Sequence, residues 1–303
     1  MVTSLDQMVG KVLSMKRRHR IAVAWAQDPG TIASVSRAVK EGFAEAVLIG
    51  QTGKISDLCI SRGIDPGLFT LISSADETDS AVTAVRLVRS GQADILMKGL
   101  VASDIFLRAI MDRNTGIMQQ NAVLSYVGAI ETPMYHKLLF VTDPAVIPYP
   151  DLRQKIAMIR YAAGMTRRFG IEKPKIALIG ASEKASSHFT YSSDYAIIKK
   201  MAEGGEFGSC IIDGPLDLFL ACDAKSTLIK GVDTPVAGDA DILLFPSLEA
   251  CNPFYKSLML FGKGSLGGMI MGTDRPVILM SRSESEQSKF YCIALACLMN
   301  GCK

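Results

Sequence analysis

Short apolar runs alternate with amphipathic stretches along almost the whole chain, and this alternation limits the possible folds more than any other feature. Strand-like runs in the first third occur at 20–26, 44–50, 69–74 and 93–99. Helical patterns separate them, and Asp28 and Pro29 open the first helix as an expected N-cap and first-turn residue. Strands separated by helices indicate βαβ units and a mostly parallel sheet.

The stretch 121–145 breaks this rhythm, because its two β-rich runs have only a short break between them, and it predicts adjacent antiparallel strands. The segment 146–151 holds two prolines in six residues and is the candidate linker. After a long helix at 152–170 the alternation resumes, with strand candidates at 175–180, 209–215, 240–247, 267–272 and 276–281 and a final helix at 285–300. A chain of 303 residues is long enough for two such α/β domains.

Composition narrows the class of partner. A net charge of +3 is too small to predict nucleic acid or a membrane surface as partner, but it suits an anionic small molecule bound by a few basic residues. No run approaches the length of a membrane helix, and the N-terminus lacks a signal-peptide pattern. Seven scattered cysteines without a CxxC pair favour reduced thiols in the cytoplasm, and disfavour disulfides and a zinc site.

Candidate binding residues follow the strands. Ligands of parallel sheets bind outside the carboxyl ends of the strands. The residues at these ends include Lys98, Asp143, Gly214-Pro215 and Ser281-Arg282. The segment 245–257 joins a strand end to a helix and adds Asn252 and Lys256, although an ordinary loop and helix start would look the same.

The stretch 97–110 has the composition of an anion site. Lys98 ends a strand, Ser103 or Asp104 is placed to cap the next helix, and Arg108 lies one turn further on. A capped helix with a solvated arginine fits the same residues equally well. The glycine-rich segment 262–268 follows a helical pattern and precedes a strand, which is the reverse of a dinucleotide fingerprint, and no P-loop is present.

Several motifs in order resemble the phosphate acetyltransferase and phosphate butyryltransferase family, nearer the butyryl branch. They are "ILMKG…FLRAIM", "KLLFVTDPAVIPYPDL", "IDGPLDL", "TPVAGDADILLFPSLEACNPFYKSL" and "PVILMSRSESEQSKFYCIALA". The resemblance implies two three-layer α/β domains flanking a cleft, with the fold of isocitrate and isopropylmalate dehydrogenases, and a homodimer or higher homo-oligomer. The expected domains are 1–145, completed by 282–303, and 146–281.

The resemblance also implies an activity of the EC 2.3.1 class. Such enzymes exchange a short acyl group, here butyryl or similar, between CoA and inorganic phosphate by direct attack in a ternary complex. CoA would be a substrate, with no tightly bound cofactor and no metal. Ser281 and Arg282 match the family's pair beside the reacting carbonyl and phosphate, and Arg108 matches a second phosphate-binding arginine.

Further contacts are expected from position more than from motif. They are the phosphate contacts Lys98, Ser103 and Ser125, and the substrate-binding residues Gly214, Pro215, Asn252 and Lys256.

One position departs from the family pattern. Acetyl-transferring relatives carry an aspartate, thought to deprotonate the CoA thiol, seven residues beyond the serine of the pair, and this chain has Ser288 there. Glu284 is the expected substitute as base, with Glu286 second. A non-catalytic acyl-CoA-binding or regulatory protein on the same scaffold is the main alternative. An NAD(P)-dependent hydroxy-acid decarboxylating dehydrogenase is less favoured, because it needs clustered metal-binding aspartates that the sequence does not show.

Overall fold

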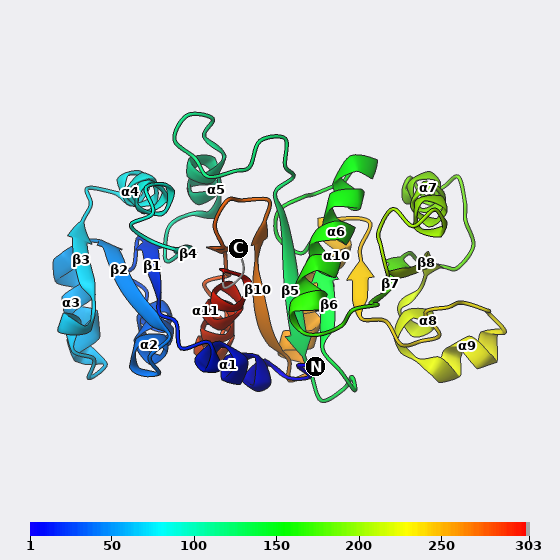
Figure 1. Ribbon diagram of the computed structural model, residues 1–303, viewed down its shortest axis with the longest axis horizontal. Helices are drawn as coiled ribbons and strands as arrows, with labels where there is room; N and C mark the ends of the chain where they lie inside the picture. The colour runs from blue at the N-terminus through cyan, green and yellow to red at the C-terminus, as the bar shows by residue number, and fades with distance from the viewer. Residues whose placement is uncertain (301–303) are drawn as a thin grey trace. The chain divides into compact units, whose positions relative to one another are not determined.

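The computed structural model describes residues 1–300, which form two compact α/β units. We name them for their place in the sequence: the central unit comprises residues 1–4 and 125–265, and the terminal unit comprises 5–124 and the chain from 266 onward. Figure 1 shows helices flanking strands in both units. The predicted α/β class with a largely parallel sheet is therefore confirmed.

The terminal unit is built on six strands in the order β3-β2-β1-β4-β11-β10. All neighbours pair in parallel except β10 and β11, which are antiparallel. The strands are β1 (His19–Ala24), β2 (Ala44–Gly50), β3 (Thr70–Ser73), β4 (Ile95–Lys98), β10 (Ser265–Met271) and β11 (Val277–Ile278). The strand predicted at 276–281 is thus shorter than expected, and Ser281 and Arg282 lie in the turn beyond it.

Among the helices of this unit, α11 packs against both α1 and α2, and α4 packs against α5. The helices are α1 (Leu5–Ser14), α2 (Pro29–Lys40), α3 (Thr52–Ser61), α4 (Glu77–Arg89), α5 (Ser103–Met111) and α11 (Glu286–Asn300), with a 3₁₀ turn η1 (Pro66–Leu68). The predicted cap of α2 is confirmed: Asp28 accepts a hydrogen bond from the Thr31 amide at 2.8 Å, and Pro29 is the first helical residue.

The C-terminal helix α11 is buried on almost every side from Ser288 to Leu298. It lies against α1 from the other end of the chain, as the red and blue ribbons of Figure 1 show, and against α2. A helix enclosed by protein needs apolar residues all round, and its sequence accordingly runs Phe-Tyr-Cys-Ile-Ala-Leu-Ala-Cys-Leu.

The central unit contains five strands in the order β5-β6-β9-β7-β8. They are β5 (Ser125–Glu131), β6 (Leu139–Thr142), β7 (Lys175–Ile179), β8 (Ile211–Leu216) and β9 (Ile242–Leu244). The predicted antiparallel pair in 121–145 is confirmed as β5 and β6, and the other neighbours are parallel. The helices are α6 (Leu152–Arg168), α7 (Tyr191–Glu203), α8 (Leu218–Cys222), α9 (Ala224–Lys230) and α10 (Leu248–Leu260).

The boundaries between the two units fall at other residues than the expected domain boundaries of 145/146 and 281/282. After the first four residues, the chain passes from the terminal to the central unit at 124/125, because β5 and β6 join the ladder of β9. It returns to the terminal unit at 265/266, because β11 pairs with β4 and β10 pairs with β11. The expected linker 146–151 lies within the central unit as the loop before α6, whose N-cap is Asp151. No helix among residues 1–300 is long and apolar enough to cross a membrane.

An ion pair between Lys289 of α11 and Asp28 of α2 should be the main polar tie of the terminal helix. The Lys289 side chain is only 6% exposed, and its Nζ lies 2.8 Å from Asp28 Oδ2. Lys289→Met removes the cation and leaves the half-buried Asp28 carboxylate with only its hydrogen bonds from Thr31, so we expect a loss of about 3 kcal/mol in the free energy of unfolding.

Denaturant titration measures this loss, and Arg62→Met provides the control. Arg62 pairs with Glu286 at 2.6 Å, but both side chains are largely exposed, so the control should cost about 1 kcal/mol or less. Equal losses for the two variants would contradict the role given to the buried pair.

Candidate active site

Polar residues gather where β1, β4 and β11 end in the terminal unit. These strands are parallel neighbours, so their carboxyl ends lie at one edge of the sheet. Lys98 is the last residue of β4, and Arg282 lies four residues beyond β11. The Arg282 guanidinium donates a hydrogen bond from Nη2 to the carbonyl oxygen of Leu100 at 2.9 Å. Two predicted site residues are thereby brought to one place by elements that are far apart in the sequence.

Lys98 is a buried cation with little direct support. The residue is only 5% exposed, and its Nζ donates one long hydrogen bond, of 3.4 Å, to the Gly99 carbonyl. Burial, together with the nearby positive charge of Arg282, lowers the pKa of Lys98 to about 8, whereas Asp28 and Glu77 oppose the shift. A bound oxyanion would supply the partner that this ammonium lacks.

The segment from Ser281 to Glu284 forms a tight turn beside Arg282. The Ser281 Oγ accepts a hydrogen bond from the Ser283 amide at 3.4 Å, and the Ser281 carbonyl accepts one from the Glu284 amide at 3.2 Å. Glu284 is half-buried. The turn therefore fixes the backbone of the predicted base relative to the predicted Ser-Arg pair.

Ser288 has a structural role at the position where relatives are expected to carry an aspartate. It is 2% exposed, and its Oγ accepts a hydrogen bond from the Leu266 amide of β10 at 3.2 Å. Its own amide donates to the Ser285 hydroxyl at 3.0 Å. The serine thus joins the start of α11 to β10, which a hydroxyl without charge does at little desolvation cost.

The predicted helix cap at Ser103 or Asp104 is wrong. Ala102 is the N-cap of α5 and makes no side-chain cap, while its amide donates to Glu77 Oε2 at 2.8 Å. Glu77 at the start of α4 therefore holds the N-cap residue of α5 by its amide, a contact between distant elements that no local pattern signals. The Arg108 side chain is 81% exposed, and its Nη2 lies 3.8 Å from Asp104 Oδ2. This agrees with the second interpretation of the stretch 97–110, a solvated arginine on the helix.

In the central unit, Ser125 belongs to a buried polar cluster. Its Oγ lies 3.3 Å from the Thr142 hydroxyl. Asp143, which follows Thr142, accepts hydrogen bonds from the amides of Ala145, Val146 and Tyr126, at 2.7, 2.8 and 3.0 Å. Burial nevertheless raises the pKa of Asp143, a residue noted at the strand end but not assigned to the site.

The other predicted residues of the central unit take separate positions. Asn252 on α10 donates from Nδ2 to the Pro144 carbonyl at 2.7 Å, and so holds the loop after β6. Gly214 and Pro215 are buried within β8, and a Cβ on Gly214 would meet the Leu178 carbonyl at 2.5 Å. Lys256 on α10 is exposed. Within this unit Asn252 adjoins the Asp143 loop, and Gly214 is explained by close backbone packing.

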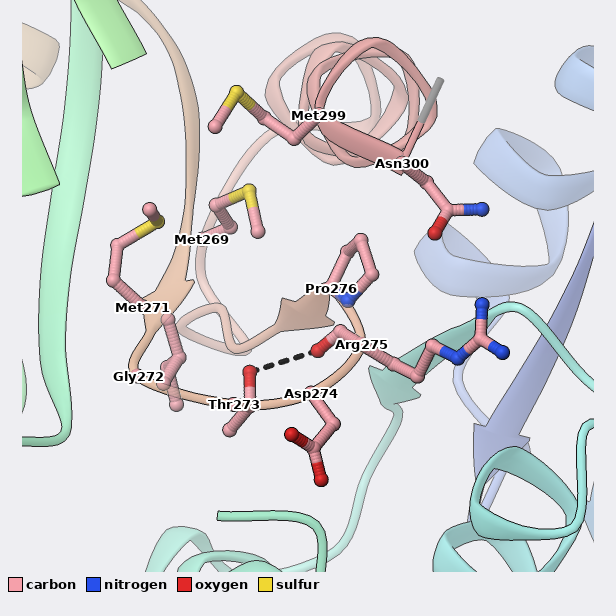
Figure 2. Close-up of a pocket in the computed structure, with 10 residues that line it drawn as sticks. Met269, Met271, Gly272, Thr273, Asp274, Arg275, Pro276, Met299 and Asn300 are labelled. Carbon is pink, nitrogen blue, oxygen red and sulfur yellow. Dashed lines mark hydrogen bonds between the residues drawn. The ribbon is translucent and has the colours of Figure 1, made fainter. Parts of the chain in front are cut away.

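Two pockets lie in the terminal unit, and they differ in position. One of about 540 Å³ is lined by residues that follow β1 and β4, together with one face of α3. The other, of about 170 Å³, lies at the turn between β10 and β11, where Met269 and Met299 flank it and Thr273 bonds to the Arg275 carbonyl (Figure 2). Because β11 begins there, the smaller pocket is at the opposite sheet edge from Lys98 and contains none of the predicted site residues.

Neither a metal cluster nor a reactive thiol is found among residues 1–300. No group of three or more His, Cys, Asp or Glu side chains in this range could hold a metal ion. No disulfide joins the cysteines of this range, and Cys302 lies outside the described residues. Cys251 is fully buried, and burial, with a contribution from Asp143, raises the pKa of its thiol well above the ordinary value.

Comparisons with known proteins agree with one another. The family model for phosphate acetyl/butaryl transferase matches residues 74–297. The chain is 37% identical to a phosphate butyryltransferase of Clostridium acetobutylicum, over 100% of both chains. It is 33% identical to a phosphate acetyltransferase of Thermotoga maritima, over 91% of this chain and 94% of that one. The crystal structure of a branched-chain phosphotransacylase from Enterococcus faecalis has a TM-score of 0.81 and 29% identity, covering 93% of this chain and 98% of its own.

The charge of Lys98 should make anion binding sensitive to pH. Since its pKa is about 8, the ammonium is mostly charged at pH 7 and mostly neutral at pH 9. We expect the affinity for inorganic phosphate, measured by calorimetry, to fall by about tenfold or more across this range as a charge-assisted contact is lost.

Lys98→Arg keeps a positive charge at both pH values, so its phosphate affinity should change less across the range than that of the wild type. Lys98→Met should bind weakly throughout and reveals the pH dependence of phosphate itself. Parallel pH profiles for all three proteins would remove Lys98 from the anion site.

Proposed function

Because the chain belongs to the phosphate acetyl/butaryl transferase family, we propose that it transfers a short acyl group between CoA and inorganic phosphate. Coenzyme A is then a substrate, and the activity is a phosphate acyltransferase of the EC 2.3.1 class. The observation that carries the proposal is the placing of Lys98 and Arg282 at one sheet edge, where Arg282 bonds to the Leu100 carbonyl. Two cations at strand ends suit the phosphate of an acyl phosphate.

The proposed reaction is a direct displacement in a ternary complex. In the direction that consumes acyl phosphate, a carboxylate takes the proton from the CoA thiol, whose ordinary pKa is about 8.5. The thiolate attacks the acyl carbonyl, and the C–O bond to phosphate breaks as the tetrahedral intermediate collapses. Arg282 and Lys98 hold the departing phosphate, while the Ser281 hydroxyl lies in the same turn to stabilise the oxyanion. The reverse direction begins with attack of phosphate on acyl-CoA.

A covalent acyl-enzyme on cysteine is disfavoured by burial. Cys251 is the cysteine closest in sequence to the predicted site residues of α10, and its thiol is enclosed and held protonated. A nucleophilic cysteine requires an accessible thiolate. This supports the direct route.

Glu284 is the proposed base, and Glu286 is the second candidate. Glu284 lies in the turn whose backbone is fixed to Ser281, the group proposed to stabilise the oxyanion. Glu286 lies beyond this turn as the first residue of α11, where its Oε1 is 2.6 Å from Arg62 Nη1. Ser288 is not proposed as the base, because its hydroxyl is buried against β10.

The finer structural assignment is part of the same proposal. We assign the two units to the two domains of an isocitrate/isopropylmalate dehydrogenase-like architecture, and we expect a homodimer or higher homo-oligomer in the cytoplasm. Each unit, taken by itself, supports this with parallel strands and one antiparallel neighbour: β10 in the terminal unit and β5 in the central one.

Arg282→Ala should abolish most activity without unfolding the protein. Phosphate-dependent release of CoA from butyryl-CoA, measured with purified protein and no added metal, should fall by about 10²–10³-fold, because a charge contact to the departing phosphate is lost. The side chain is exposed and makes one main-chain hydrogen bond, so thermal melting should change little.

Arg282→Lys should rescue poorly, since a lysine lacks the planar fork that binds two phosphate oxygens. Wild-type activity in either variant would refute the role of Arg282. A wild-type protein that releases no CoA from any short acyl-CoA would instead favour the non-catalytic binding protein.

Glu284→Gln should lower the rate by about 10²–10⁴-fold and weaken its dependence on rising pH, because general-base assistance is lost. Glu286→Gln is the matched control on the neighbouring turn and should keep most activity. If the control is the more damaging variant, the two glutamates exchange roles.

A further inference from the structure

The pocket of about 540 Å³ in the terminal unit has no role in the proposal so far. Four of its residues lie on one face of α3, at i, i+3, i+4 and i+7: Lys54, Asp57, Leu58 and Ser61. Trp25 and Gln27 come from the segment after β1, and Leu100 comes from the segment after β4. Its volume is in the range of small-molecule sites.

The pocket shares a wall with the proposed phosphate site. Leu100 lines the pocket, and its carbonyl oxygen accepts the hydrogen bond from Arg282 at 2.9 Å. Lys98, the buried cation, lies two residues earlier on the same strand end. A group bound in the pocket would therefore lie beside whatever is attached to the phosphate.

The chemistry of the lining favours an aliphatic group over a charged one. Trp25, Leu58 and Leu100 offer apolar surface, and Trp25 is only partly exposed. Lys54 and Asp57 stand one helical turn apart with opposite charges, so this pair adds no net charge to the lining. The diphosphate of CoA would meet the carboxylate of Asp57 as well as the ammonium of Lys54, whereas an alkyl chain needs only the apolar surface.

We propose that this pocket is the acyl-chain subsite, and that Trp25, Leu58 and Leu100 set the chain-length preference. The inference rests on the proposed function, because it assigns the phosphate end of the acyl phosphate to Lys98 and Arg282. The carbonyl then lies at the segment 98–100, and the chain extends from there along Leu100 toward Trp25 and α3.

Trp25 is the single tryptophan of the chain, so its fluorescence reports on this pocket without labelling. Butyryl phosphate carries the chain without CoA, and CoA carries the nucleotide without the chain. We expect butyryl phosphate to change the Trp25 emission, acetyl phosphate to change it less, and inorganic phosphate and free CoA to leave it unchanged. A full change with free CoA, or none with butyryl phosphate, would overturn the assignment.

A filling substitution gives the kinetic test. Leu58→Phe narrows the pocket, so the ratio of kcat/KM for butyryl-CoA to that for acetyl-CoA should fall by about tenfold, the scale on which pockets discriminate one or two methylenes. Ile60→Phe is the matched control, because Ile60 lies on the same helix, is 67% exposed and does not line the pocket. Its ratio should stay at the wild-type value.

The outcomes separate this inference from the proposed function. If the wild type releases CoA but Leu58→Phe slows all acyl-CoAs equally, the subsite assignment is wrong and the activity stands. If the wild type releases no CoA, the activity fails, and the Trp25 emission still decides whether the pocket takes an alkyl chain. A Leu58→Phe protein that does not fold leaves the wild-type fluorescence series as the deciding measurement.

Discussion

The contact between Lys289 and Asp28 fixes the geometry on which the proposed site depends. It joins the first turn of α11 to the cap of α2 in a largely buried pair, 2.8 Å apart. The approach is possible because Gly30 has no side chain: a Cβ there would meet Lys289 Nζ at 2.9 Å. Since α11 begins a few residues after Arg282, fixing its start also limits where the turn carrying Arg282 can lie.

The same pair shapes the electrostatics at the strand ends. Hydrogen bonds from Lys289 and Thr31 lower the pKa of Asp28 despite the opposing effect of burial, so its charge persists at neutral pH. Asp28 and Glu77 then offset part of the repulsion between Lys98 and Arg282, but not enough to restore an ordinary lysine pKa. The edge therefore retains an excess of positive charge next to a buried ammonium, where a charge interacts more strongly with an anion than it does in bulk water.

The start of α11 carries Ser288 where the family resemblance leads us to expect an aspartate. Ser288 is buried against β10, and its uncharged hydroxyl avoids the desolvation cost that a carboxylate would meet there. In the proposed reaction the base for the thiol is Glu284, which lies in the turn before the helix. The serine at 288 and the glutamate four residues earlier are consistent parts of one proposed arrangement.

Much of this protein follows from its sequence alone. The alternation of apolar runs and helical patterns determined the α/β class, the mostly parallel pairing of the strands and the antiparallel pair β5 and β6. Each of these follows from hydrophobic periodicity, which is a local property. The cap at Asp28 and the strand end at Lys98 were equally local. Only the tertiary structure decided which distant groups meet: Glu77 with the Ala102 amide, Lys289 with Asp28, and Trp25 with the face of α3. These contacts join residues that are 25 to 261 positions apart in the sequence. Which residues meet over such a separation depends on how the elements pack together, and no local pattern encodes that packing.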